Sequence, residues 1–143
     1  MKQSIRFALF SAGALLALIG GSLMFTPKSF LEDSGIVLQP EPSLMSELTA
    51  PSAVLIVTAS LMIFAAFRAR YSNLALLVGA AVYGSYGLGR VISMLIHGVP
   101  SQSLLIALCL ELTIAVVLLA LRAKDYSLRV RISSSSDFLE RQA

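Results

Sequence analysis

The chemically distinctive residues of this sequence are two ionisable side chains inside apolar stretches. Arg90 and Glu111 are each flanked on both sides by mostly apolar residues. An isolated charge in lipid costs roughly 2.5–3.5 kcal/mol on insertion scales, so two such residues are expected to neutralise each other. We predict a buried Arg90–Glu111 ion pair, and we expect Glu47 to be a third member of the same cluster.

Hydrogen-bonding side chains recur at helical spacing around Arg90. They lie three, four or seven residues from it, which places them on one side of a helix: Tyr83, Tyr86, Ser93 and His97. This polar stripe has two interpretations. It either helps the ion pair to clamp two helices in register, which we favour, or lines a pocket that binds an anionic headgroup or small solute through Arg90.

The remaining reactive residue types give no sign of catalysis. The sequence has no phosphate-binding loop, no nucleophile elbow and no HExxH motif. A lone histidine, His97, makes a poor metal site, and the single cysteine, Cys109, is expected to be a small apolar filler. We therefore expect no metal, no cofactor and no enzymatic activity.

The overall composition indicates which solvent surrounds the chain. Of 143 residues, 57% are hydrophobic and 13% are charged, whereas soluble domains carry about 25% charged residues. This argues against a soluble enzyme domain, a disordered chain and a coiled coil. One cysteine and no tryptophan also argue against a disulfide-rich module. Lipid must be the solvent for much of the chain.

Four apolar runs are long enough to cross a bilayer, which takes about 20 residues for a hydrocarbon core of about 30 Å. They cover residues 5–25, 48–67, 73–96 and 103–121. We predict an all-α, antiparallel bundle of four transmembrane helices within residues 1–125. The first run follows Lys2 and Arg6 and also fits a signal peptide, but it continues to Phe25 without a convincing cleavage pattern, which favours a retained helix.

The last two runs explain why Arg90 and Glu111 should meet. A short turn, 97–102, joins them, so the helices are antiparallel neighbours. At 1.5 Å per residue, both charged residues should lie roughly 10–15 Å below the outer helix ends. Matched depth on adjacent helices is the geometry that an ion pair needs.

The distribution of Lys and Arg predicts the orientation of the bundle. Nine of these residues lie before or at the start of the first run, between the second and third runs, or after the fourth, whereas the other side has Lys28 alone. Because Lys and Arg concentrate on the cytoplasmic side, both termini should be cytoplasmic. The pI near 9.4 then reflects topology, and no nucleic-acid partner is expected.

Two segments outside the runs differ in character. The linker 26–47 carries Phe30, Leu31, Ile36 and four acidic residues, and we expect it to pack at the outer interface as a short helical or re-entrant lid. Residues 126–143 include a serine run at 133–136 and are expected to form a flexible cytoplasmic tail.

Small residues at four-residue intervals predict close helix packing. Two such stripes occur: Gly13, Ala17 and Gly21 in the first run, and Ala81, Ser85 and Gly89 in the third. We favour packing within the chain over homodimerisation, because four helices already supply partners. The third helix is expected to be the central and most crowded one.

Several local motifs carry a family resemblance. They are Ser46-Glu47-Leu48-Thr49-Ala50-Pro51, the run from Gly87 to Ser93, His97-Gly98-Val99-Pro100-Ser101 and Leu110-Glu111-Leu112. Together they resemble a bacterial family of small four-helix membrane proteins, the domain of unknown function 4345, over roughly residues 13–121. The resemblance implies a four-helix bundle in a bacterial inner membrane, with a charged trio at Glu47, Arg90 and Glu111. Relatives often carry Arg where this chain has Thr49 and an acid where it has His97, which weakens a proton-relay role.

Three classes of function fit the sequence. The favoured one is a non-enzymatic accessory protein that packs with other membrane-protein subunits in the bilayer. The alternative is a protein that binds or transports a lipid or small anionic solute through a polar pocket open to the outer side. The third is an enzyme, such as an oxidoreductase subunit that handles a quinone or a lipid, for which no cofactor ligands are seen.

Overall fold

The computed structural model describes residues 2–37, 39 and 41–140, with side chains described up to residue 127. Four long helices account for most of the chain: α1 (Gln3–Phe25), α3 (Pro42–Phe67), α4 (Ser72–His97) and α5 (Gln102–Glu140). A short helix, α2 (Pro27–Glu32), follows α1, and a single 3-10 turn, η1 (Ala69–Tyr71), joins α3 to α4. The four long helices are apolar enough to cross a membrane, which confirms the predicted all-α bundle.

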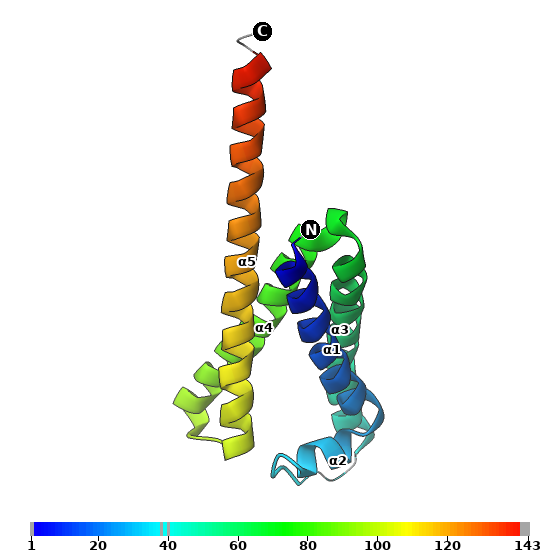
Figure 1. Ribbon diagram of the computed structural model, residues 1–143. Helices are drawn as coiled ribbons and strands as arrows, with labels where there is room; N and C mark the ends of the chain where they lie inside the picture. Colours follow the sequence, from blue (N-terminus) through cyan, green and yellow to red (C-terminus); the bar gives the residue numbers. More distant parts are fainter. Residues whose placement is uncertain (1, 38, 40, 141–143) are drawn as a thin grey trace.

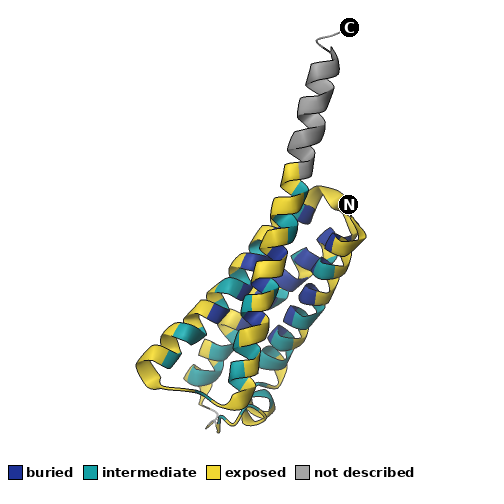
Figure 2. Cartoon of the chain, turned by 60° about the vertical axis from the view of Figure 1, so that its left-hand side comes forward, coloured by how far each residue is buried: buried dark blue, intermediate teal, exposed yellow. Residues whose placement is uncertain are grey.

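Two antiparallel helix pairs make up the bundle. Helix α1 packs along α3, helix α4 packs along α5, and the two pairs meet mainly where α3 contacts α4. Both chain ends lie at the same end of the bundle, while α2 and the α4–α5 turn lie at the other (Figure 1). Helix α4 runs obliquely, so its C-terminal end lies away from α3 (Figures 1 and 2).

The tightest packing lies in the half of the bundle nearest the N-terminus. Buried residues gather there, whereas the half nearer α2 is mostly partly buried or exposed (Figure 2). The core contains large fully buried side chains from all four long helices, including Ile5, Leu9, Met62, Leu76 and Leu118. The looser half is the one that holds the Arg90–Glu111 pair described below.

Glycines allow α1 and α3 to approach closely, but at positions that differ partly from those predicted. A Cβ at Gly13 would lie 3.1 Å from Met62 Cβ, and one at Gly20 would lie 2.9 Å from Leu55 Cβ. A Cβ at Gly21 would meet nothing within 4 Å. The prediction of Gly21 as a packing residue is therefore wrong: Gly20, one position earlier, faces α3.

The second predicted stripe does not pack within the chain. Its three residues, Ala81, Ser85 and Gly89, are all exposed. Helix α4 instead buries Gly79 against Met62 and Leu118, and Gly87 against Leu112. Nor is α4 the most crowded helix, because 39% of the most apolar stretch of α3 is buried, against 33% in α4. The oblique course of α4 explains both differences, since one of its faces leaves the bundle.

Helix α5 continues well beyond the predicted fourth span. It is one helix from Gln102 to Glu140 and projects past the other helices at the end that holds the termini (Figure 1). The backbone of residues 126–140, within the predicted tail, is therefore helical, and residues 141–143 of that tail lie outside the described residues. Polar residues from Arg122 onward end the apolar run without interrupting the helix, because many of them have good helix propensity.

Candidate functional site

Arg90 and Glu111 lie together on adjacent helices. Arg90 Nε donates to both carboxylate oxygens of Glu111, at 3.1 Å to Oε1 and 2.9 Å to Oε2. The Glu111 side chain is 11% exposed and the Arg90 side chain 32% exposed. The short turn between α4 and α5 produces this contact, as matched depth predicted.

The pair uses only part of the hydrogen-bonding capacity of Arg90. A guanidinium group has five N–H donors, and the contact to Glu111 uses Nε–H alone. Within the described part of the chain, neither Nη nitrogen forms a hydrogen bond. Arg90 is therefore neutralised in charge and still offers N–H donors to a further group.

A cavity of about 220 Å³ lies beside the ion pair, in the looser half of the bundle. Arg90 and Glu111 form one part of its wall together with Tyr83 and Tyr86. Most of the remaining wall is apolar, with Leu16, Ile19 and Leu23 from α1, Leu55 from α3, and Leu104 and Ala107 from α5. The result is an apolar chamber with a concentrated polar patch.

The two tyrosines of the wall differ in their hydrogen bonding. The Tyr83 hydroxyl is buried and donates to the Ala12 carbonyl oxygen of α1 at 2.7 Å. It thereby joins the two helix pairs across the bundle. Tyr86 is partly buried and, among the described residues, its hydroxyl has no hydrogen-bond partner. Tyr83 is thus structural, whereas the Tyr86 hydroxyl is available.

Ser93 and His97 share the helix with Arg90 but do not line this cavity. Both are exposed, in the part of α4 that leaves the bundle. Ser93 instead belongs to a shallow hollow on the outer surface of α4, together with Ser85, Tyr86, Gly89 and Arg90. The predicted stripe is therefore divided, with Tyr83 in the cavity, Ser93 in the surface hollow, and Tyr86 and Arg90 in both.

Glu47 is not part of the cluster, contrary to expectation. It is exposed near the start of α3 and, within the residues described, its side chain forms no ion pair or hydrogen bond. Helix α4 diverges from α3 towards this end of the bundle, so Arg90 reaches Glu111 on its own partner helix and Glu47 is left on the other pair (Figure 1). The charged group is a pair and not a trio.

The segment around α2 covers the end of the cavity that is nearest to it. Phe30, Leu31 and Ile36 contribute apolar wall. The Ser34 carbonyl accepts hydrogen bonds from Ser101 Oγ at 2.9 Å and from Ser103 Oγ at 3.5 Å, which connects the segment to the start of α5. The unusually apolar composition of the linker indicated a lid, but not that it would cover this cavity.

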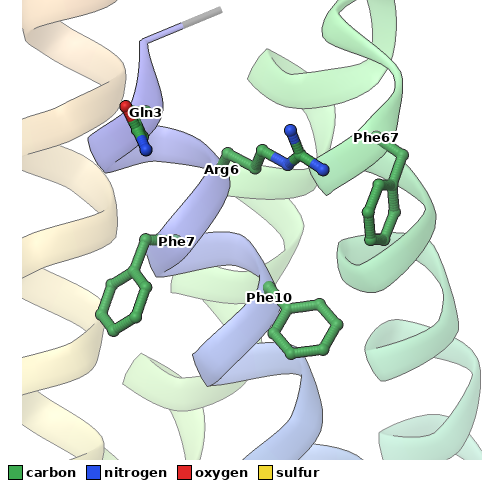
Figure 3. A pocket seen from close by; sticks show the side chains of 5 residues that line it. All are labelled: Gln3, Arg6, Phe7, Phe10 and Phe67. Atoms are coloured by element: carbon green, nitrogen blue, oxygen red, sulfur yellow. The ribbon is translucent and has the colours of Figure 1, made fainter.

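A wider, open hollow at the other end of the bundle has a different character. Arg6 lies over the Phe67 ring at 5.0 Å, and Phe10 meets the same ring edge-on at 6.2 Å, while Phe7 points the other way (Figure 3). A guanidinium over an aromatic ring is a cation–π contact, and here it joins α1 to the end of α3.

Metal-ligating residue types do not gather in the described residues, where no group of three or more His, Cys, Asp or Glu side chains is close enough to hold a metal ion. Cys109 is an exposed free cysteine, not a residue packed inside the bundle as a filler would be. Its side of α5 faces away from the cavity wall, since Cys109 does not line it.

Comparison with known proteins places the chain in one family. The sequence profile described as "Domain of unknown function (DUF4345)" matches residues 4–122, which includes all four predicted spans and both members of the ion pair. Searches of curated proteins and of solved structures give no significant match. The match covers most of the chain, and the protein therefore belongs to the DUF4345 family.

Proposed function

We propose that this protein is a non-enzymatic membrane protein that binds a small amphiphilic molecule in the cavity beside Arg90 and Glu111. The observation that carries the proposal is the cavity itself: an apolar chamber between four helices with an ion pair in its wall. Of the sequence-based functions, this favours ligand binding over a purely structural accessory role. We further propose a bacterial inner-membrane location with both termini in the cytoplasm.

The size of the cavity limits what it can hold. At about 220 Å³ it exceeds an engineered protein cavity of about 150 Å³ that takes benzene, and it falls below the roughly 300–1,000 Å³ of typical drug-sized sites. It therefore suits one small ring or a short length of acyl chain. A larger lipid would place only part of itself inside.

The electrostatics of the wall favour a neutral polar group over an anion. Arg90 and Glu111 cancel in formal charge, so a second anion at Arg90 would face the Glu111 carboxylate at close range in a medium of low dielectric constant. The free Nη–H donors still suit a carbonyl or ether oxygen. An ester or ketone group next to an apolar chain matches this wall better than a free carboxylate or phosphate.

The polar side chains of the cavity wall favour ligand binding over acid–base catalysis. The Glu111 carboxylate accepts from Arg90, and the Tyr83 hydroxyl donates to a backbone carbonyl. Among the described residues that line the cavity, no histidine, cysteine or second carboxylate accompanies Glu111 to form an acid–base pair. This supports a protein that holds its ligand without transforming it.

Fluorescence quenching can test the proposal, because the chain contains no tryptophan. Phe30→Trp would place a single reporter in the cavity wall. Phe25→Trp, at the exposed end of α1, provides a matched reporter near the same end of the bundle. The probe is methyl 9,10-dibromostearate, an ester that quenches tryptophan, titrated into phosphatidylcholine vesicles that contain either variant.

We expect saturable quenching of the Phe30→Trp reporter at low probe content and only gradual quenching of the Phe25→Trp reporter. The free acid, 9,10-dibromostearate, should bind more weakly than the ester. Replacing both charges, as Arg90→Leu with Glu111→Leu, should weaken ester binding about tenfold, the effect of losing a charged hydrogen bond of about 1.5 kcal/mol. Equal, unsaturable quenching of both reporters would contradict a binding cavity.

A second candidate function rests on the exposed face of α4. Small residues at positions 81, 85 and 89 are typical of helix–helix contacts in membranes, and here they face away from the bundle. We therefore keep the accessory role as the alternative proposal. Stoichiometric copurification of another membrane protein, lost with Ser85→Leu, would favour it.

A further inference from the structure

Two side chains separate the cavity from the surface hollow on α4. Tyr86 and Arg90 line both the deeper cavity, of about 220 Å³, and the shallower hollow formed by Ser85, Gly89 and Ser93, of about 410 Å³. A side chain that borders two spaces is the wall between them. Both are long side chains, and a change of their rotamers alters this wall.

The other way into the cavity is covered by a segment that side-chain hydrogen bonds hold in place. The segment after α2 covers the outer end, and its Ser34 carbonyl accepts hydrogen bonds from Ser101 and Ser103. Opening this end requires a segment that includes Leu31 and Ile36 to lift, which exposes apolar wall to the aqueous boundary. Opening by the side-chain wall exposes the cavity to lipid and carries no such hydrophobic cost.

We infer that the cavity is loaded sideways from the bilayer, through a portal formed by Tyr86 and Arg90, and that its ligand is a membrane-dissolved amphiphile with a neutral hydrogen-bond acceptor. This inference rests on the proposed function, which names the ligand class, and adds the route by which the ligand enters. The hollow on α4 presents the Ser85 and Ser93 hydroxyls beside the Arg90 guanidinium. The polar group of a ligand that passes inward can therefore leave the hydroxyl donors of Ser85 and Ser93 and bind the N–H donors of Arg90.

The hydrogen bonding of the two portal residues fits this role. Arg90 is held to Glu111 through Nε alone, so its two Nη nitrogens keep N–H donors that the ion pair does not use. The Tyr86 hydroxyl has no partner among the described residues. Tyr83, by contrast, is fixed by its bond to Ala12 and forms a rigid inner limit.

A matched pair of glycine substitutions tests the portal. A Cβ at Gly89 or at Gly21 would meet nothing within 4 Å, so the two sites are matched in tolerating the first atom of a side chain. Gly89→Phe places a ring in the hollow next to the portal, whereas Gly21→Phe places it on α1. In the Phe30→Trp background, methyl 9,10-dibromostearate is delivered from phosphatidylcholine vesicles, and the rate of quenching is followed.

A disulfide across the outer end tests the competing route. A Cβ at Gly35 would lie 4.0 Å from Ser101 Cβ, within the range for a disulfide. The variant carries Gly35→Cys and Ser101→Cys with Cys109→Ala, so that no other thiol is present. Gly35 has φ +81°, which strains a cysteine there, and the reduced form of the same variant controls for that strain.

We expect Gly89→Phe to slow quenching at least fivefold, with Gly21→Phe and the oxidised disulfide variant close to the parent rate. Slow loading in the disulfide variant with a normal rate in Gly89→Phe would overturn the portal in favour of the α2 end. Unchanged rates in all variants would also overturn it. If the Phe30→Trp parent itself shows no saturable quenching, the proposed binding function is wrong. That outcome is distinct from a failure of the portal, which only the other variants test.

Discussion

Arg90 and Glu111 combine a structural and a chemical role at the scale of single residues. A bidentate arginine–carboxylate contact commits two donors, whereas here one N–H serves both oxygens. The pair is therefore weaker than it could be, and the remaining donors are left for a ligand. Partial exposure of Arg90, at 32%, lowers the desolvation cost that a fully buried pair would carry.

Removing one charge should cost more stability than removing both. Arg90→Ala leaves the Glu111 carboxylate in an apolar wall without its partner, whereas Arg90→Leu with Glu111→Leu leaves no stranded charge. We expect the single variant to be less stable by about 1–3 kcal/mol, below the roughly 3–5 kcal/mol of fully buried pairs because Arg90 is partly exposed. Thermal unfolding in detergent measures this, and equal stability of the two variants would contradict a buried pair.

The two tyrosines give a second test at this scale. Tyr83→Phe removes the hydrogen bond to the Ala12 carbonyl and should destabilise the protein by about 0.6–1.5 kcal/mol. Tyr86→Phe removes a hydroxyl that has no partner among the described residues and should leave the unfolding midpoint nearly unchanged. A larger loss in Tyr86→Phe than in Tyr83→Phe would show that the assignment of the two hydroxyls is reversed.

At the scale of helices, contact between α1 and α3 depends on which glycines face α3. Backbone approach at Gly13 and Gly20 replaces side-chain interdigitation, as is usual for helices packed in lipid. Helix α4 makes its close contacts with Gly79 and Gly87 and turns its other small residues outward. Each helix thus has one protein-facing side, defined by shape more than by polarity.

Adjacent glycines on α1 should respond in opposite ways to alanine. A Cβ at Gly20 would lie 2.9 Å from Leu55 Cβ and 3.1 Å from the Ser52 carbonyl oxygen, so Gly20→Ala must push α1 from α3. We expect a loss of about 1–3 kcal/mol, as for other overpacked sites. Gly21→Ala has free space and should be neutral or more stable by up to about 1 kcal/mol, because alanine favours helix.

Unfolding midpoints of the two variants in the same detergent provide the measurement. Circular dichroism of the folded state serves as the control, because both variants should keep the parent helix content. If Gly21→Ala were the more damaging change, the face of α1 assigned to α3 would be wrong by about 100°, the rotation per residue of a helix.

At the scale of the whole molecule, the bundle has a tight half and a loose half. The tight half lies near the termini, where Met62, Leu76 and Leu118 are fully buried. The loose half contains the cavity, the ion pair and the α2 segment. We propose that the tight half fixes the helix arrangement, which leaves the other half free to open for a ligand.

The proposed orientation predicts which turns are accessible from outside the cell. In a Cys109→Ala background, Val99→Cys at the exposed α4–α5 turn should react with a membrane-impermeant maleimide added to intact bacterial cells. Tyr71→Cys, at the opposite end of α4, should react only after the membrane is permeabilised. Labelling in the reverse order would contradict cytoplasmic termini, which the excess of Lys and Arg on that side predicts.

Sequence alone determined the features that depend on composition and on short-range connection. Four long apolar runs predicted the four helices, since each run in lipid must satisfy its backbone within a helix. The Arg90–Glu111 contact could also be predicted, because a short turn fixes two antiparallel helices at matched depth. Neither conclusion depends on how the two helix pairs are arranged.

The choice of helix faces that meet, and the point where α4 leaves the bundle, depend on contacts between segments that are far apart in the chain. Gly20 and Gly21 are chemically identical, and their roles differ because successive residues of a helix point about 100° apart. Glu47 is separated from Arg90 because α3 and α4 diverge, a matter of crossing geometry that local sequence does not encode (Figure 1). In lipid the outward and inward faces of a helix are both apolar, so polarity cannot distinguish them, and the choice depends on shape complementarity between distant segments.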